Sequence, residues 1–286
     1  RDKHVTGVQT CALPIWGQGF ASFRGCASAL WALNKHAAFL ADWKARAPVL
    51  PPAAAPVCDD IAPGVLNELQ TSSLLSAYAI PVPSNALVCD RAAALTQARA
   101  MGFPVVLKIQ SPDIAHKTEA GGVALNVGEG DVEAAFDRIM ASAKAYAPDA
   151  RIEGVLVQKM MPKGHEIVIG ITRDPDFGPL VMLGSGGIYL EVLKDVVFAP
   201  PPISTEAAKT LIGRLKTAPI LEGVRGEAAG DLDALAALIS RVADLARAEG
   251  NIDQLDLNPV FVYPAGEGVV AVDALAVAGQ PVGGGH

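Results

Sequence analysis

The sequence is poor in the features that mark disulfide-rich, zinc-binding and membrane-spanning proteins. It has four cysteines in 286 residues, and Cys11, Cys26, Cys58 and Cys89 show no CxxC spacing. We therefore expect neither a disulfide framework nor a cysteine zinc site, and a reducing cytoplasm fits this pattern. No uninterrupted apolar run approaches the length of a membrane span.

Positive charge is also scarce. Lysine and arginine total 23 against 30 acidic residues, which gives a formal net charge of -7, and no block of basic residues occurs. This balance argues against a nucleic-acid surface and favours a small-molecule partner. A composition of 51% hydrophobic and 19% charged residues is typical of a globular chain.

The first residues do not read as part of a fold. Residues 5–15, VTGVQTCALPI, resemble one translated frame of a common sequencing-library adapter without a break. We therefore expect residues 1–16 to be an artefact and exclude them from fold reasoning. The chain is then expected to be the downstream piece of a longer reading frame.

The sequence predicts an upstream remnant, a linker and one main domain. Residues 27–46 read as an amphipathic helix, with apolar residues at helical spacing: Leu30, Leu33, Ala37 and Leu40. A stretch rich in proline and alanine follows, which is typical of an interdomain linker. The expected boundaries are 17–46 for the tail of an upstream domain, 47–60 for the linker, 61–278 for the main domain and 279–286 for a C-terminal tail.

Helical and strand-like segments alternate in the main domain, which predicts a mixed α/β (α+β) class with short crossovers. Helices are predicted over 65–78, 91–101 after a cap at Asp90, 131–147, a segment capped by Ser204, and 231–249. Strands are predicted over 105–109, 123–127, 154–158, 166–172, 180–183, 253–263 and 268–274.

A lysine inside a strand and the loop after it predict an anion site. Lys108 interrupts the apolar run VVLKI, and His116 and Lys117 follow in QSPDIAHKTEAGG. Lysine is a common phosphate ligand, and Gly121 and Gly122 would let backbone N–H groups approach an anion. The alternative for Lys108 is a side chain that extends to solvent from a strand edge.

A glycine loop follows the segment LVML. Gly184, Gly186 and Gly187 match neither the GxGxxG dinucleotide fingerprint nor a Walker loop. The alternative is a tight turn followed by surface charges, Glu191, Lys194 and Asp195. Glu166 begins the predicted strand 166–172 and is a candidate for a ribose or metal-water contact. Its neighbour His165 is expected to be a solvated turn residue.

Oxygen ligands gather near the C-terminal end of the chain. Asp256 and Asn258 alternate in one strand and therefore share a face, and Asp273 lies in the next strand. Magnesium takes a few carboxylate or amide oxygens together with substrate phosphates. The pattern predicts a magnesium site, and its alternative is a set of strand-end acids and turn caps.

The segments VVLKIQSPDIAHKTEAGGV, GVLVQKMMPKGHEIVIGITRDPDFGPLVMLGSGGIYLEVLKDV, GVRG and LDLNP occur in this order. The series resembles the ATP-grasp domain of NDP-forming acyl-CoA synthetases, which include ADP-forming acetate–CoA ligases, over about residues 61–278. Residues 17–46 are similar to the last helix of the ligase-CoA domain in fused members. The resemblance implies an ATP-grasp fold of two subdomains, preceded by a helical remnant of that domain.

The resemblance also implies an acid–thiol ligase activity: acid + CoA + ATP = acyl-CoA + ADP + phosphate, through a phosphohistidine and an acyl phosphate. The implied cofactors are ATP or ADP and Mg²⁺, and CoA and the carboxylic acid would bind through upstream domains that this chain lacks. The chain alone is then expected to be inactive. The acyl substrate and the oligomeric state stay open.

Site residues can be carried over by motif position. The resemblance implies catalytic roles for His116, as a phosphate relay, and for Asp256, as an acidic neighbour of the metal. It implies Mg²⁺ binding by Asn258 and Asp273, and nucleotide binding by Lys108, Lys117, Gln158, Glu166, Gly186, Gly187 and Arg225. One departure is Ala199, which follows Phe198 where the family usually carries arginine.

Two alternatives of other classes remain. One is a regulatory or non-catalytic nucleotide-binding module, as in fused acetyltransferase relatives, which would be favoured by a lack of magnesium-dependent nucleotide binding. The other is an ATP-grasp carboxylate–amine ligase, against which the histidine of the phosphate loop and the upstream helix argue.

Overall fold

A computed structural model divides the chain into two compact units, residues 1–52 and 53–286. The residues that it describes are 30–35, 37–38, 56, 61–114, 116–187, 194–224, 226 and 228–279. Residues 30–35 and 37–38 are helical, while the rest of the predicted helix 27–46 lies outside the described residues, as do Glu191 and Arg225. Within the described part of the chain, every helix is too short or too polar to span a lipid bilayer.

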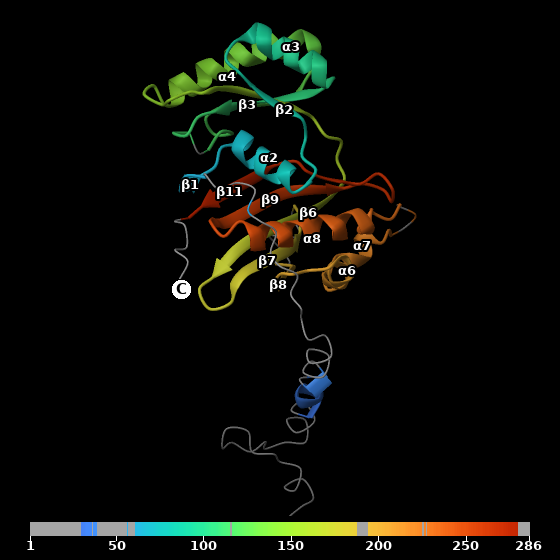
Figure 1. Ribbon diagram of the computed structural model, residues 1–286. Helices are drawn as coiled ribbons and strands as arrows, with labels where there is room; N and C mark the ends of the chain where they lie inside the picture. The colour runs from blue at the N-terminus through green and yellow to red at the C-terminus, as the bar shows by residue number, and fades with distance from the viewer. Residues whose placement is uncertain are drawn as a thin grey trace, which may run out of the picture. The chain divides into compact units, whose positions relative to one another are not determined.

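The smaller of two sheets in the second unit has the strand order β2-β5-β3-β4, and all its described pairings are antiparallel. Two helices cover one of its faces (Figure 1). Alanines of α3 and larger apolar residues of α4 pack there on β3 and β5. The bounds are β2 (Asn85–Val88), α3 (Arg91–Met101), β3 (Val105–Gln110), β4 (Val123–Val127), α4 (Val132–Tyr146) and β5 (Gly154–Lys159).

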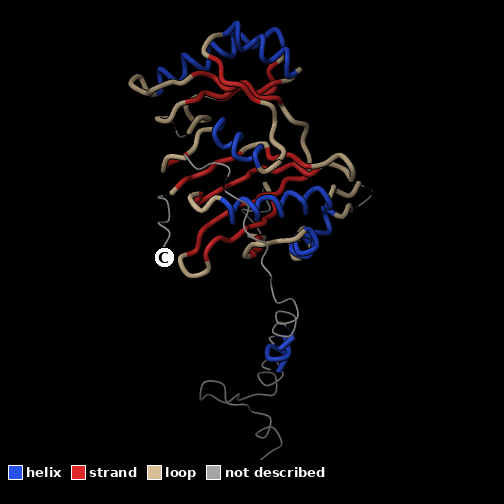
Figure 2. The backbone as a smooth tube through the Cα atoms, in the orientation of Figure 1, coloured by secondary structure: helices blue, strands red, loops and turns tan. Residues whose placement is uncertain are grey.

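The larger sheet has the order β1-β11-β9-β6-β7-β8, with β10 paired to β9, and it is also antiparallel throughout its described part. Helices α6 and α8 pack into its core. Figure 2 shows the strands of the two sheets in red and the helices in blue. The bounds are β1 (Gly64–Val65), β6 (His165–Asp174), β7 (Gly178–Ser185), β8 (Val196–Ala199), α6 (Thr205–Ile212), α7 (Ala218–Leu221), α8 (Leu232–Ala248), β9 (Ile252–Val262), β10 (Val269–Ala271) and β11 (Ala274–Ala278).

Helix α2 (Glu68–Ala77) lies between the two sheets (Figure 1). It begins three residues later than the sequence predicted, because Asn67 has extended backbone and caps the helix through a reciprocal pair of hydrogen bonds with Gln70. Val65, predicted as helical, instead pairs with Val277 as part of β1. Leu74 and Leu75 anchor α2 in the core of the larger sheet.

The two predicted caps, Asp90 and Ser204, are confirmed, and Asp231, where the last helix was expected to begin, also serves as a cap. Asp90, Ser204 and Asp231 each accept a hydrogen bond from a backbone N–H in the first turn of α3, α6 and α8. Gly102 takes a positive φ of 80° directly after α3. The predicted mixed class is confirmed in its α+β form, since both sheets are antiparallel within the described residues.

The charges after the glycine loop are not all on the surface. Asp195 is 4% exposed and accepts hydrogen bonds from the backbone N–H groups of Lys216 and Thr217, and from the hydroxyl of Ser185 at 2.9 Å. Burial alone raises the pKa of Asp195, but these donors outweigh it and leave the pKa lowered. The surface-charge alternative is therefore wrong for Asp195, which ties the end of β7 to the segment before α7.

Candidate nucleotide site

A cleft of about 1090 Å³ receives side chains from both sheets and from α2. Its lining combines residues that are far apart in the sequence, from β1 to the start of β11. The sequence-predicted residues along this cleft are Lys108, His116, Lys117, Gln158, Asp256, Asn258 and Asp273.

Lys108 points into the cleft because of strand alternation. Its neighbours Leu107 and Ile109 are fully buried in the core beneath α3 and α4, so the lysine lies on the opposite face of β3. Its side chain is 13% exposed, and Nζ lies 3.2 Å from Glu68 Oε2 and 3.5 Å from Asp273 Oδ1. This is a paired charge inside a cleft rather than a lysine extended to solvent.

The loop after β3 folds back on itself through its two glycines. Gly121 has a φ of 63°, and its N–H donates to Thr118 O. The N–H of Gly122 donates to Lys117 O at 2.7 Å, and a Cβ at this position would lie 2.4 Å from Ile109 Cγ2. The N–H groups of Gly121 and Gly122 therefore close the turn, and Gly122 is required by close packing. That other backbone N–H groups of this loop approach an anion stays a prediction.

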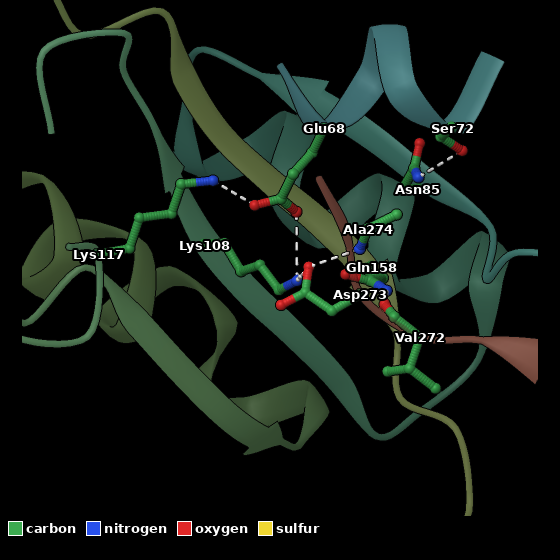
Figure 3. A network of polar contacts seen from close by, with 9 residues as sticks. All are labelled: Glu68, Ser72, Asn85, Lys108, Lys117, Gln158, Val272, Asp273 and Ala274. Carbon is green, nitrogen blue, oxygen red and sulfur yellow. Dashed lines mark hydrogen bonds and ion pairs between the residues drawn. The ribbon is translucent and has the colours of Figure 1, made fainter. Parts of the chain in front are cut away.

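Glu68 is the site residue that the sequence did not reveal. Figure 3 shows its carboxylate between Lys108 and Lys117, with one oxygen toward each ammonium group. Burial raises the pKa of Glu68, but the two lysines more than offset this effect, so the pKa lies below its usual value. The only local signal was that Glu68 directly follows the helix cap Asn67. Acids in the first turn commonly stabilise the helix through its dipole and have no further role.

Gln158 joins the two parts of the cleft near Lys108. It lies on β5, is 4% exposed, and its Nε2 donates to the backbone oxygen of Val272 at 2.9 Å (Figure 3). Val272 directly follows β10 of the larger sheet, so the amide of Gln158 connects β5 of the smaller sheet to the larger sheet. A second link is formed by Asn85 of β2, which donates to Ser72 of α2 at 3.1 Å.

Asp256, Asn258 and Asp273 form an acidic wall opposite the lysines. Leu255 and Leu257 are buried in the core, so the intervening side chains of β9 face the cleft. Asn258 N donates to Asp273 O at 3.1 Å, which places the two residues side by side.

Asp256, Asn258 and Asp273 suit Mg²⁺ only if phosphate oxygens bind the same ion. Among the described residues, no group of three or more His, Cys, Asp and Glu side chains could hold a metal ion. Two carboxylates and an amide do suit Mg²⁺ where phosphate oxygens and water complete its octahedron. The donors therefore match a metal delivered together with a nucleotide.

Asp256→Asn is expected to stabilise the folded chain at neutral pH. Burial first, and the charge of Asp273 second, raise the pKa of Asp256, and a hydrogen bond with Asn258 only partly opposes them. The pKa of this carboxyl is higher in the folded state than in the unfolded state. The free energy of unfolding therefore falls as the pH rises from the unfolded-state pKa through the folded-state pKa, and it stays lower at higher pH. Because Asp256 is itself exposed on the cleft face, solvent screens much of this penalty. In urea denaturation we therefore expect a gain of only about 0.5 kcal/mol at pH 7 that vanishes near pH 3, about where unfolded aspartates protonate.

The matched control is Asp137→Asn, which removes an exposed carboxylate that pairs with Arg91 at 3.2 Å, away from the cleft. It is expected to change the free energy of unfolding little, and not upward. A gain for Asp256→Asn that is equally large at pH 3, or a loss at pH 7, would contradict the electrostatic explanation.

Glu166, Gly186 and Gly187 form a group of their own and are not among the residues that line the cleft. The N–H of Gly186 donates to Glu166 O at 2.8 Å, and a Cβ on Gly186 would lie 2.6 Å from Glu166 Cβ. A Cβ on Gly187 would meet Glu166 Oε2 at 2.8 Å. The glycines thus make room for Glu166, and their predicted contacts to nucleotide stay predictions.

Comparison with known proteins agrees with this geometry. Residues 61–277 match the model of an ATP-grasp domain. The chain is 44% identical over 211 residues to the beta subunit of an ADP-forming acetate–CoA ligase I of Pyrococcus furiosus, with 73% of this chain and 90% of that subunit covered. It is 46% identical over 209 residues to an ADP-forming acetate–CoA ligase I of Archaeoglobus fulgidus, of which it spans 30%.

A solved structure shows the same fold. The acetyl-coenzyme A synthetase 1 of Ca. Korarchaeum cryptofilum, in complex with coenzyme A and Ca-AMPCP, superposes with a TM-score of 0.71 at 38% identity. The match covers 75% of this chain and 93% of the solved one. Fold and cleft define an ATP-grasp domain. More narrowly, the chain belongs to the ATP-grasp domain family of the ADP-forming acyl-CoA synthetases, and the ATP-grasp fold predicted from the sequence is confirmed.

Proposed function

We propose that this chain binds ATP or ADP with Mg²⁺ in the cleft and supplies the nucleotide-binding part of an acid–thiol ligase. The whole enzyme would catalyse acid + CoA + ATP = acyl-CoA + ADP + phosphate. One observation carries this proposal: Lys108 of the smaller sheet lies 3.5 Å from Asp273, beside Asn258 of the larger sheet. Cations and metal ligands thus face each other across one cleft, as a metal-bound polyphosphate requires.

Each cleft residue has a role in the proposal. Lys108 and Lys117 hold phosphate oxygens as point charges, and Gln158 of β5 reads the base. Asn258 and Asp273 hold Mg²⁺, which would neutralise charge on the phosphates when bound, and Asp256 supports that site. Positioning and charge stabilisation account for most of phosphoryl-transfer catalysis.

His116 is the proposed phosphoryl acceptor. An unprotonated ring nitrogen would attack the terminal phosphorus of ATP, the bond from that phosphorus to the bridging oxygen would break, and ADP would leave with the electron pair. A histidine nucleophile divides one difficult transfer into two easier ones. The support is that His116 lines the same cleft as both lysines.

CoA and the carboxylic acid are proposed to bind to domains that this chain does not contain. The Pyrococcus relative is a beta subunit, and a structure of the Korarchaeum synthetase has a phosphohistidine segment pointing towards its nucleotide binding site. A histidine-bearing segment of a partner could reach our cleft in the same way. The cysteine spacing supports the cytoplasm as the proposed compartment.

Isothermal titration calorimetry on the full chain tests the nucleotide site. We expect one equivalent of ATP or ADP to bind in the presence of Mg²⁺, and binding to weaken by about tenfold or more in EDTA, because the acidic wall then faces bare phosphates. If neither nucleotide binds with Mg²⁺ present, the proposal fails, and the regulatory or non-catalytic module is favoured.

A further inference from the structure

Glu68 holds the same ammonium groups that the proposed function assigns to phosphate. One carboxylate oxygen takes Lys108 at 3.2 Å and the other takes Lys117, so a single anion bridges both cations. Figure 3 shows the three side chains meeting tip to tip. A bridging carboxylate of this kind occupies the donors as a pair of phosphate oxygens would.

The bridge crosses between the two cores of the second unit. Glu68 begins α2, whose Leu74 and Leu75 pack in the core of the larger sheet. Both lysines belong to β3 and to the loop after it, which pack in the core of the smaller sheet. A change at Glu68 therefore alters the connection between the two parts of the cleft as well as its charge.

The bridge is shielded from solvent and stays ionised. The side chains of Lys108, Glu68 and Lys117 are 13%, 17% and 21% exposed. The lowered pKa keeps Glu68 charged at neutral pH, although burial by itself would favour its neutral form. Since these ion pairs are largely screened from water, a phosphate that binds both lysines has to displace the carboxylate of Glu68.

We propose that Glu68 is an internal counter-ion that competes with nucleotide phosphates for Lys108 and Lys117, and so limits how tightly the cleft binds polyphosphates. This inference rests on the proposed function, because it takes the two lysines to be the phosphate ligands. Nucleotide binding then exchanges one anion for another at both ammonium groups. The alternative is that Glu68 orients the lysines for phosphate, and it predicts the opposite effect of neutralising Glu68.

Tripolyphosphate is the probe that separates these alternatives, because it tests the lysines without a base or sugar. Calorimetric titration of the full 286-residue chain is expected to give a Kd about tenfold lower for Glu68→Gln than for the natural sequence. Removing one negative charge should also make that affinity fall more steeply with added salt. Glu68→Asp keeps the charge and should restore the natural affinity to within about twofold.

Glu129→Gln is the matched control. Glu129 pairs with Arg99 at 2.8 Å on the exposed surface of the same small-sheet part, so the chemical change is identical but lies outside the cleft. It should leave tripolyphosphate binding unchanged. Near-ultraviolet circular dichroism shows whether each variant is folded, and Glu68→Ala gives a second neutral side chain that should act in the same direction as glutamine.

The outcomes also separate this inference from the proposed function. Tighter tripolyphosphate binding by Glu68→Gln with no nucleotide binding by any variant supports the counter-ion role and contradicts the nucleotide site. Equal or weaker tripolyphosphate binding by both neutral variants overturns the counter-ion role, whatever the nucleotides do. If Glu129→Gln also bound tripolyphosphate more tightly, the gain in affinity would come from net charge alone. That result would also overturn the counter-ion role of Glu68.

Discussion

Lys108→Met is expected to weaken binding of Mg-ATP by about a hundredfold. The side chain is nearly buried and points across the cleft at Asp273, so its ammonium group lies where cations of one sheet meet oxygens of the other. Methionine fills similar space but offers no charge and no N–H donor. Calorimetric titration with Mg-ATP measures the loss.

This variant also removes a partner of Glu68 and Asp273, so its folded state needs a separate check by urea denaturation. Lys209→Met is the matched control: Lys209 forms an exposed ion pair with Asp233 between α6 and α8, away from the cleft. It should bind Mg-ATP as the natural sequence does. A folded Lys108→Met protein with undiminished affinity would remove Lys108 from the phosphate site.

His116→Asn is expected to abolish phosphoryl relay while nucleotide binding stays within about threefold of normal. Asparagine keeps some of the size and polarity of the imidazole but has no nucleophilic ring nitrogen. With a ligase-CoA partner supplied, turnover should fall by about three orders of magnitude, as for other enzymes that lose a reacting group. Labelled ATP should also leave no acid-labile phosphate on this chain.

His165→Asn is the control for the relay. His165 is the first residue of β6 and is not among the residues that line the cleft. Its replacement should leave both turnover and acid-labile labelling intact. Unchanged turnover and labelling in His116→Asn would show that phosphate reaches the partner without this histidine.

Elements with strong local signals could be predicted from the sequence. Helix α8 is an example, because Asp231 caps it and leucines recur on its buried face. Strand β3 is another, because its apolar run is β-branched and short. In the structure, strand alternation places Lys108 on the cleft face of β3.

Contacts between distant segments could not be predicted in this way. The pairing of Glu68 with Lys108 and Lys117 spans 40 and 49 residues, and it depends on how α2 is placed between the sheets. The roles of Gly122 and Asp195 depend on neighbours that pack against them in the fold, Ile109 in one case and Ser185 and Thr217 in the other. Such pairings have no short-range pattern to reveal them.

The central claim is that two lysines and two oxygen ligands from opposite sides of the cleft bind one metal-bridged nucleotide. The lysines are Lys108 of β3 and Lys117 of the loop after it, and the oxygen ligands are Asn258 of β9 and Asp273 between β10 and β11. A crystal structure of this chain with Mg²⁺ and a non-hydrolysable ATP analogue tests it most directly. We expect phosphate oxygens within hydrogen-bonding distance of both lysines, with Mg²⁺ bound to Asn258 and Asp273. A nucleotide bound elsewhere, or one whose phosphates touch neither lysine, would contradict the claim.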